Sequence, residues 1–411
     1  MRFIGFPALL TSATALASLS FAAPLANGKD RRSFIERDGV NYTVFEHAAT
    51  GAKLEFVTNS GICETTPGVN QYSGYLSVGT GMNMWFWYYQ RNPKCRMILN
   101  IVRFFEARNN PTTAPLATWF NGGPGCSSMI GLFQENGPCH FVGGASTPSL
   151  NPYSFNEYAN TLYVDQPIGV GFSYGTDSVT STATAAPYVW KLLQAFYTQF
   201  PQYENRDFGI FTESYGGHYG PEFAHYIQQQ NSAIDANTTT GQKINLVALG
   251  INNGWIDGVI QEKAYVQFSY NNTYKPLISQ SNYDTYMATY SRACLPASQA
   301  CMSTGTDDDC SNANRRCYND IEGPLTGAAN FNVYDIRQPS NDPNPPETYV
   351  QYLQSAAVVK AIGAKSTYQE CPDAPYNKFT PSGDGARSFL STLGAVVSTG
   401  LTTLIWAGDA E

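Results

Sequence analysis

The chain has 411 residues, 43% of them hydrophobic, and a formal net charge of -8 without a long run of one sign. This length is enough for one large α/β domain with an insertion, or for two ordinary domains. The acidic balance argues against a nucleic-acid partner and favours a soluble protein.

The N-terminal segment is typical of a secretory signal peptide. An apolar stretch follows one arginine, and small residues surround Ser20 to Ala23, so we expect a signal peptide over residues 1–22. A membrane anchor is the alternative, but the segment is short, contains Ser and Thr, and is followed by the polar NGKDRRS. We therefore expect a secreted protein without a membrane span, with the vacuole as an alternative destination.

Cysteines and glycosylation sequons agree with this route. Nine cysteines are present, and Asn-x-Ser/Thr sequons occur at Asn41, Asn237 and Asn271. A segment poor in apolar residues contains Cys294, Cys301, Cys310 and Cys317. Disulfides are expected there, because the alternative, zinc, would need free thiolates in an oxidising compartment and no histidine lies in the stretch. We expect no metal and no other cofactor.

Short β-branched or aromatic runs that end in Gly-rich turns predict strands in the first part of the chain. They cover residues 72–79, 82–89, 116–123, 161–167, 208–214 and 244–254. Residues 182–200 predict a helix, because apolar side chains recur there at helical spacing. Alternating strands and helices imply an α/β protein with a largely parallel sheet covered on both faces.

The pattern changes after Trp255. A Tyr-, Asn- and Cys-rich region with few strand signals continues through a Pro-rich segment, and strand character returns at residues 401–409. This predicts a core interrupted by an insertion. The expected divisions after the signal peptide are a first part of the core at 23–255, an inserted cap at 256–395, and a returning core at 396–411 that stops early.

Ser214 lies in FTESYGGHYG, between a predicted strand and a helix that begins near Gly216. A sharp turn in this position lifts a serine hydroxyl above the sheet, as in a nucleophile elbow. The usual GxSxG pattern is broken, because Thr212 replaces the first glycine. A chance Gly/Ser turn is the alternative.

The second candidate segment is WFNGGPGCSS, residues 119–128. Its three glycines follow a predicted strand, so bare backbone N–H groups could face a ligand as an oxyanion hole does. A structural Gly-Pro-Gly loop is the alternative.

Five segments together carry a family resemblance: WFNGGPGCSS, ENGPC, LYVDQPIGVGFSY, FTESYGGHYG and NNGWIDG. In their order and rough spacing the chain resembles the serine carboxypeptidases, especially fungal secreted, carboxypeptidase S1-like members. The resemblance implies an α/β-hydrolase core with an inserted cap, and removal of single residues from peptide C-termini. Peptide or protein C-termini are then the expected partners.

The resemblance also implies roles for individual residues. Ser214 would be the nucleophile, and the amides of Gly123 and Tyr215 would stabilise the oxyanion. Asn121, Glu135 and Glu213 would bind the terminal carboxylate of the substrate. A glutamate binds a carboxylate only if the two share a proton, and two clustered glutamates raise the pKa of the pair, so binding should weaken as pH rises.

The remaining triad residues are problematic. Asp165 precedes the serine and is interpreted as structural, because the triad acid follows the serine in this fold. The family's Gly-Asp-x-Asp corresponds to Gly408–Glu411, which makes Glu411 the only, and a poor, candidate acid. The fold requires the histidine after the acid, and no residue follows. All four histidines of the chain precede Glu411: His47, His140, His218 and His225. His218 lies four residues after Ser214 on the expected helix and points away from it. The triad histidine is therefore expected to be absent.

Disulfides and function follow from the same resemblance. It implies the pairs Cys126–Cys371, Cys294–Cys317 and Cys301–Cys310. Three cysteines are left without an assigned partner: Cys63, Cys95 and Cys139. A bond between Cys63 and Cys139 is favoured, but the pairing of these three stays open. The expected function is a serine-type carboxypeptidase, inactive as written for want of the histidine. The alternatives are a non-catalytic binder of peptide C-termini, or an acyltransferase or esterase of the same fold.

Overall fold

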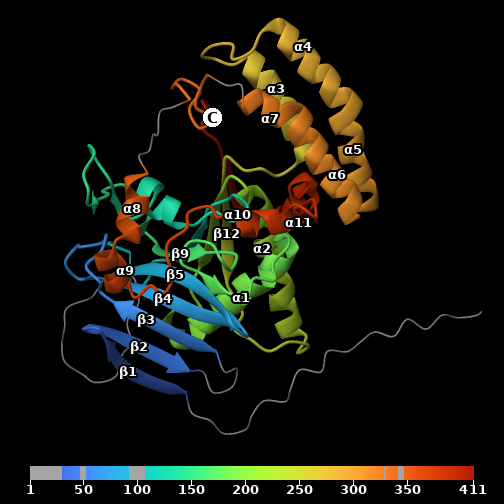
Figure 1. Ribbon diagram of the computed structural model, residues 1–411. Helices are drawn as coiled ribbons and strands as arrows, with labels where there is room; N and C mark the ends of the chain where they lie inside the picture. Colours follow the sequence, from blue (N-terminus) through green and yellow to red (C-terminus); the bar gives the residue numbers. More distant parts are fainter. Residues whose placement is uncertain (1–29, 47–51, 92–106, 328–329, 341–346) are drawn as a thin grey trace, which may run out of the picture.

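The computed structural model describes residues 30–46, 52–91, 107–327, 330–340 and 347–411. The expected signal peptide, His47 and Cys95 lie outside these ranges. Figure 1 shows one large sheet, with a group of helices above one end of it.

The large sheet has the strand order β1-β2-β3-β4-β5-β9-β6-β11-β12-β13, with β10 paired to β5. The strands of this sheet are β1 (Arg31–Arg37), β2 (Val40–Glu46), β3 (Lys53–Thr58), β4 (Val69–Gly79), β5 (Met82–Arg91), β6 (Leu116–Phe120), β9 (Asn160–Asp165), β10 (Tyr174–Gly175), β11 (Phe208–Glu213), β12 (Leu246–Asn252) and β13 (Thr402–Trp406). A separate pair is formed by β7 (Cys139–His140) and β8 (Ser149–Leu150).

The expectation of a largely parallel sheet is wrong for the first half. Strands β1 to β5 pair antiparallel with one another, and β5 pairs antiparallel with β9. Only β9, β6, β11, β12 and β13 run parallel. The cause is connection length: β4 and β5 are joined by a tight turn, which permits only an antiparallel neighbour, whereas a parallel neighbour needs a long crossover.

Two long helices cover the parallel strands. Helix α1 (Thr182–Gln199) begins with a capping box between Ser181 and Thr184 and buries a continuous apolar face. Helix α2 (Gly216–Asp235) starts directly behind Ser214 and packs on β11, β12 and α1. The main core is rich in fully buried aromatic side chains such as Trp85, Trp87 and Tyr163.

The first part of the expected insertion folds into a helical cap, which Figure 1 shows in yellow and orange above the core. Its elements are α3 (Gly258–Tyr270), α4 (Gln280–Thr289), η4 (Tyr290–Cys294), α5 (Leu295–Thr304), α6 (Asp307–Cys317), η5 (Tyr318–Glu322) and α7 (Gly323–Gly327). Helix α6 begins with three aspartates and ends with two arginines, which complements the helix dipole. Its polar sequence alone would not hold it in place, so the disulfides described below secure it.

The remaining helices return to the core. They are α8 (Thr348–Gln354), α9 (Ala356–Ile362), α10 (Asp373–Phe379) and α11 (Leu390–Ser398), with the short turns η1 (Gly131–Glu135), η2 (Phe155–Glu157), η3 (Pro201–Tyr203) and η6 (Asp384–Ala386). Helix α11 packs on α2, so the expected cap boundary at residue 395 falls inside a helix that contacts the core. Among the described residues, no helix is both long and apolar enough to cross a membrane.

Candidate active site

Ser214 occupies the turn between β11 and α2 and has a left-handed backbone, with φ of 58°. A non-glycine residue rarely adopts this conformation, and it persists here because the backbone is tied on both sides. The Ser214 amide donates to Asn252 O (3.0 Å), and its carbonyl accepts from Gly217 N (2.9 Å) and Trp255 N (2.8 Å). The side chain is thereby held exposed at the carboxyl end of the parallel strands.

The residues around the serine explain the broken GxSxG pattern. Thr212 is buried, and its hydroxyl donates to Gly216 O at 2.9 Å, so it ties the strand to the first turn of α2. A Cβ at Gly217 would lie 2.4 Å from Trp255 O, a contact that only glycine avoids. A Cβ at Gly216 would likewise lie 2.5 Å from Thr212 Cβ, so both glycines of the pair are required by close packing.

The loop after β6 lies directly against the serine. A Cβ at Gly122 would come within 2.4 Å of Tyr215 N and 2.8 Å of Ser214 Cβ. In the described residues, the amides of Gly123 and Tyr215 donate no hydrogen bond, and both residues line the same cavity as Ser214. Two free N–H groups beside a serine hydroxyl are the arrangement that stabilises an oxyanion.

Asn121 brings two carboxyl groups together beside the nucleophile. Its Nδ2 donates to Glu135 Oε1 (2.9 Å) and to Glu213 Oε2 (2.8 Å). Its Oδ1 accepts from the Trp119 indole (2.8 Å) and from Gly131 N (2.9 Å), which fixes the amide orientation. Glu213 also accepts from Asn252 Nδ2 at 3.3 Å.

The two carboxyl groups of Glu135 and Glu213 interact, and both have raised pKa values. Burial raises the pKa of Glu135 well above its ordinary value, and the neighbouring Glu213 carboxylate raises it further. Burial also raises the pKa of Glu213, which hydrogen bonds from Glu135, Asn252 and Asn121 partly offset. The protonated form is therefore favoured more strongly at Glu135 than at Glu213.

Asp165 is a structural residue. It is fully buried and accepts from the Ser127 hydroxyl (2.5 Å), Ser128 N (3.1 Å) and Phe172 N (2.9 Å). Burial raises the pKa of Asp165 to about 7. Its hydrogen bonds join β9 to the segment after the oxyanion loop and leave no oxygen free for a histidine.

His218 also has a structural position. It is fully buried, with Nδ1 2.6 Å from Trp255 O and Nε2 3.1 Å from Asp384 O, and burial lowers its pKa. His140 lies in β7, and His225 lies in α2 with Nε2 at 2.8 Å from Gln229 Nε2. Across the described ranges, no histidine forms a hydrogen bond with Ser214.

Glu411 lies near the same site. Burial raises the pKa of Glu411 to about 7, and the charge of Glu213 adds to the shift. Glu411 therefore contributes to the charge around the Glu135–Glu213 pair.

The cap and core enclose a cavity of about 210 Å³ beside Ser214. Gly123, Tyr215 and Trp255 line its core side, and cap side chains that include Glu262 and Glu322 line the other. Tyr215 is held in the wall by a hydrogen bond from its hydroxyl to Asp384 at 2.7 Å. No sequence motif marks Glu262, Glu322 or Asp384, because they come from segments far from Ser214 along the chain.

The described residues form four disulfides: Cys63–Cys139, Cys126–Cys371, Cys294–Cys317 and Cys301–Cys310. They are the pairs that the sequence analysis favoured. The second links the oxyanion loop to the segment before α10, and the last two brace the cap. Asn41, Asn237 and Asn271 are all exposed, as a glycosylation site must be.

Comparison with known proteins gives one consistent result. Residues 61–411 match the family model described as serine carboxypeptidase. The chain is 67% identical over 356 residues to Carboxypeptidase S1 of Penicillium janthinellum, covering 87% of this chain and 80% of that protein. It is 37% identical to Carboxypeptidase Y of Schizosaccharomyces pombe, covering 84% of this chain and 34% of that protein.

A solved structure gives the fold independently. The prohormone-processing carboxypeptidase KEX1(DELTA)P of Saccharomyces cerevisiae matches with a TM-score of 0.67 at 21% identity, over 86% of this chain and 76% of that one. The strand–serine–helix turn at the end of a parallel strand and the inserted cap are those of an α/β-hydrolase fold.

Proposed function

Because the chain belongs to the serine carboxypeptidase family, we propose that it binds peptides through their free C-terminal carboxylate and places the last peptide bond against Ser214. The observation that carries this proposal is the pair of hydrogen bonds by which Asn121 holds the Glu135 and Glu213 carboxyl groups together, with the pKa of Glu135 raised. A carboxylate ligand accepts from the Asn121 amide and from the proton on Glu135, and neither group attracts an amidated terminus as strongly.

The scissile carbonyl would then lie between Ser214 and the two free amides. An oxyanion that forms there accepts from Gly123 N and Tyr215 N, which cost no reorganisation because the loop and the turn are already fixed. The serine oxygen bonds to the carbonyl carbon, the peptide C–N bond breaks, and the proton lost by the serine ends on the departing amine of the C-terminal residue, which leaves an acyl-enzyme for water to hydrolyse.

The pH dependence of binding follows from the direction of the pKa shifts. The raised pKa of Glu135 means that the required proton is present at pH 5 and is lost as pH rises through that pKa. Free-acid peptides should bind more tightly at pH 5 than at pH 8. Isothermal titration of one peptide as the free acid and as the amide, at both pH values, tests the proposal. Equal affinity for the two forms would contradict it.

We also propose that the 411-residue chain turns substrate over slowly. The support is the position of the described histidines: His218 is engaged by two backbone carbonyls, and none of the histidines in the described ranges forms a hydrogen bond with Ser214. A neutral serine hydroxyl is a weak nucleophile, and only the oxyanion amides and substrate binding are left to accelerate the reaction. On this proposal the chain as given is a binder of peptide C-termini with residual hydrolysis.

Secretion and glycosylation complete the proposal. The four disulfides and the exposed sequons at Asn41, Asn237 and Asn271 support a route through an oxidising, glycosylating compartment. Peptides or protein C-termini outside the cell or in a vacuole would be its ligands. A glycosidase-induced mass shift in the protein isolated from culture medium would test this, and cytosolic retention without glycans would refute it.

A further inference from the structure

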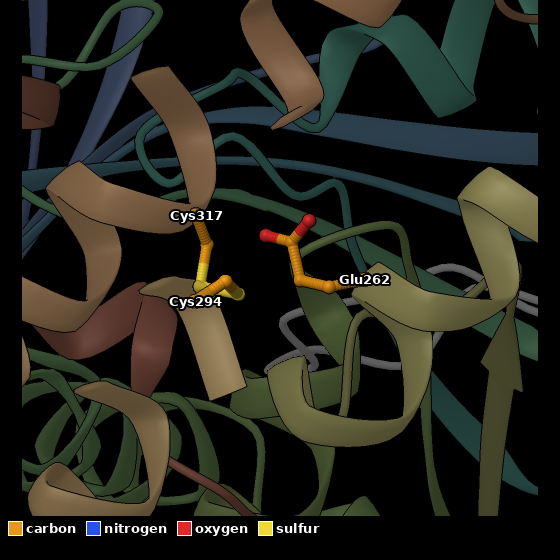
Figure 2. Close-up of side chains that lie close together, drawn as sticks. All are labelled: Glu262, Cys294 and Cys317. Atoms are coloured by element: carbon orange, nitrogen blue, oxygen red, sulfur yellow. A yellow bond between two sulfur atoms is a disulfide. The ribbon is translucent and has the colours of Figure 1, made fainter. Parts of the chain in front are cut away.

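Two buried carboxyl groups close to the Ser214 region have no basic partner in the part of the chain that the structure describes: Glu262 and Asp384. Figure 2 shows Glu262 beside the Cys294–Cys317 disulfide. This cluster is not a metal centre, because the two sulfurs are bonded to each other and neither is a thiolate. Asp384 differs, because its carboxylate is hydrogen-bonded to the residue that directly follows the serine.

The Asp384 carboxylate is held by donors from two other elements. Asp384 begins η6 and is 1% exposed. Its Oδ2 accepts from Thr182 N at 3.1 Å, from the Thr182 hydroxyl at 2.5 Å and from the Tyr215 hydroxyl at 2.7 Å. Thr182 is the first residue of α1, so the carboxylate also lies at the positive end of that helix dipole. These donors and the dipole stabilise the buried charge in place of a lysine or arginine.

The backbone that carries Asp384 is fixed without the help of Tyr215. The chain turns at Gly383, which has a φ of 59° and whose Cβ would meet the backbone of α6 at 2.1 Å, so only glycine fits there. The Asp384 carbonyl accepts from Arg387 N at 3.0 Å, and His218 Nε2 lies 3.1 Å from the same oxygen. The Tyr215 hydroxyl therefore meets an acceptor whose position is set by the rest of the fold.

The Tyr215 backbone is held by hydrogen bonds on its carbonyl side only. The carbonyl accepts from His218 N at 3.0 Å and from Tyr219 N at 3.3 Å, both in the first turns of α2. The amide donates no hydrogen bond among the described residues, and the peptide unit before it follows the left-handed backbone of Ser214. The direction of the Tyr215 N–H therefore depends on how the whole residue is anchored, and its second anchor is the hydroxyl group at Asp384.

The ring of Tyr215 gives this anchor a fixed sense. Burial and the charge of Asp384 raise the pKa of Tyr215, so the hydroxyl keeps its proton and donates to the carboxylate. The ring also packs near His218, with centroids 4.5 Å apart, and near Tyr219, with centroids 5.3 Å apart. These contacts restrict the tilt of the ring, whereas the hydrogen bond fixes where its far end lies.

We propose that Asp384 is a positioning residue for the chemistry at Ser214, because by accepting the Tyr215 hydroxyl it fixes the direction of the Tyr215 N–H in the oxyanion hole. Asp384 is not among the residues that line the cavity, so it acts through Tyr215. The proposal rests on the proposed function for the place of the oxyanion between Gly123 N and Tyr215 N. Without the anchor the N–H is less well aligned, and its hydrogen bond to a developing negative charge weakens.

The experiment compares two ligands of the 411-residue chain, acetyl-Ala-Ala-phenylalaninal and the corresponding alcohol, acetyl-Ala-Ala-phenylalaninol. The serine O–H adds across the aldehyde C=O, so a hemiacetal forms at equilibrium and the serine proton ends on its new hydroxyl group. That oxygen occupies the oxyanion position and accepts from the two amides, whereas the alcohol forms no adduct. The ratio of the aldehyde affinity to the alcohol affinity, measured by isothermal titration calorimetry, therefore reports on the oxyanion hole.

In the unmodified chain we expect the aldehyde to bind at least about tenfold more tightly than the alcohol. Asp384→Ala and Tyr215→Phe should each lower this ratio at least about fivefold, because each removes one side of the same hydrogen bond while the Tyr215 amide remains. The double variant should lose no more than the more impaired single variant, since both changes remove one interaction. Tyr215→Phe carries the test if Asp384→Ala does not fold, which circular dichroism shows.

Two further variants distinguish positioning from a general loss of structure. Thr182→Val removes one hydrogen bond to Asp384 but keeps the Thr182 N–H and the Tyr215 contact, so the ratio should stay unchanged even where the melting temperature falls. Asp384→Asn keeps an oxygen that accepts from the Tyr215 hydroxyl, so it should retain most of the ratio.

Three results would overturn the inference. One is a full ratio in folded Asp384→Ala or in Tyr215→Phe. Another is a loss in Thr182→Val as large as theirs, because the effect would then follow stability and not the Tyr215 anchor. The third is a loss in Asp384→Asn equal to that in Asp384→Ala, because charge and not the hydrogen-bond acceptor would then be the cause.

The unmodified chain separates this inference from the function on which it rests. An aldehyde/alcohol ratio near one there refutes the proposed oxyanion hole and the role of Asp384 together. A high ratio that no variant lowers refutes the role of Asp384 and leaves the proposed function standing. Equal affinity for a free-acid peptide and its amide refutes carboxylate recognition alone, because the aldehyde carries no carboxylate.

Discussion

Asn121 is the single side chain that connects both carboxyl groups of the recognition site to the strand that precedes the oxyanion loop. Its amide is fixed by Trp119 and Gly131, so its two donor hydrogens point at Glu135 and Glu213 whether or not a ligand is present. On the proposed function, the site is therefore preorganised to bind a peptide carboxylate. The property that changes with pH is the protonation of Glu135 and Glu213.

Replacement of Glu135 by glutamine should remove the titrating carboxyl group while it keeps a side chain of nearly the same size. In Glu135→Gln the side chain keeps a donor that does not titrate, so the affinity for a free-acid peptide should change less between pH 5 and pH 8 than in the unmodified chain. The measurement is titration calorimetry at both pH values, with Glu36→Gln, at an exposed position on β1, as control. An unaltered pH profile would show that Glu135 does not hold the proton.

At this scale the sequence was informative wherever a residue lies in a continuous motif. Ser214, Gly123 and Asn121 each lie in a long motif that contains its own turn. Glu262, Glu322 and Asp384 escaped sequence reasoning because each is an isolated acidic residue, whose burial is decided by the packing of distant elements.

Helix α2 depends on a glycine at its second residue, because the backbone of Trp255 passes there at van der Waals distance. In Gly217→Ala the new Cβ would lie 2.4 Å from Trp255 O, and backbone atoms on both sides would have to move. We expect a loss of about 1–3 kcal/mol in the free energy of unfolding, together with weaker labelling of Ser214 by a fluorophosphonate.

A second helical glycine is the matched control. Gly394 in α11 has nothing within 4 Å of its Cβ position, so Gly394→Ala should leave stability unchanged or raise it by up to about 1 kcal/mol. Thermal unfolding of both variants provides the comparison. Equal melting temperatures would mean that the turn behind Ser214 adapts freely to a larger side chain.

At the scale of elements, the strands and α1 were predictable because their apolar residues recur with a clear period. The direction of strand pairing in the first half was not, since it depends on the turns that join β1 to β5. The cap was predicted only as an insertion, because its helices carry weak amphipathic patterns and rely on covalent links.

The whole molecule contains several buried carboxyl groups whose pKa values are raised by folding. The pKa is about 7 for Asp165 and about 8 for Glu262, and that of Glu135 is also raised. Above pH 6.5 the same groups are ionised in the unfolded chain, so the folded state binds more protons. Stability should therefore fall from pH 6.5 to pH 8.5, by up to about 1.4 kcal/mol per pH unit for each fully protonated group.

Guanidinium unfolding followed by tryptophan fluorescence at pH 6.5, 7.5 and 8.5 measures this slope. Glu262→Gln removes one of the titrating groups and should flatten the curve near pH 8. A midpoint that rises over this interval would mean that the buried carboxyl groups are ionised in the folded protein.

On the proposed function this chain recognises peptide C-termini, and in the part of it that the structure describes no histidine lies in hydrogen-bond contact with Ser214. Release of the C-terminal amino acid from a free-acid peptide, measured at saturating substrate beside the Penicillium janthinellum relative, tests it most directly. The account predicts turnover lower on the order of a millionfold, as loss of a triad member produces, while calorimetry still detects peptide binding. Turnover within about tenfold of the relative would contradict it, because a residue of this chain would then be removing the serine proton.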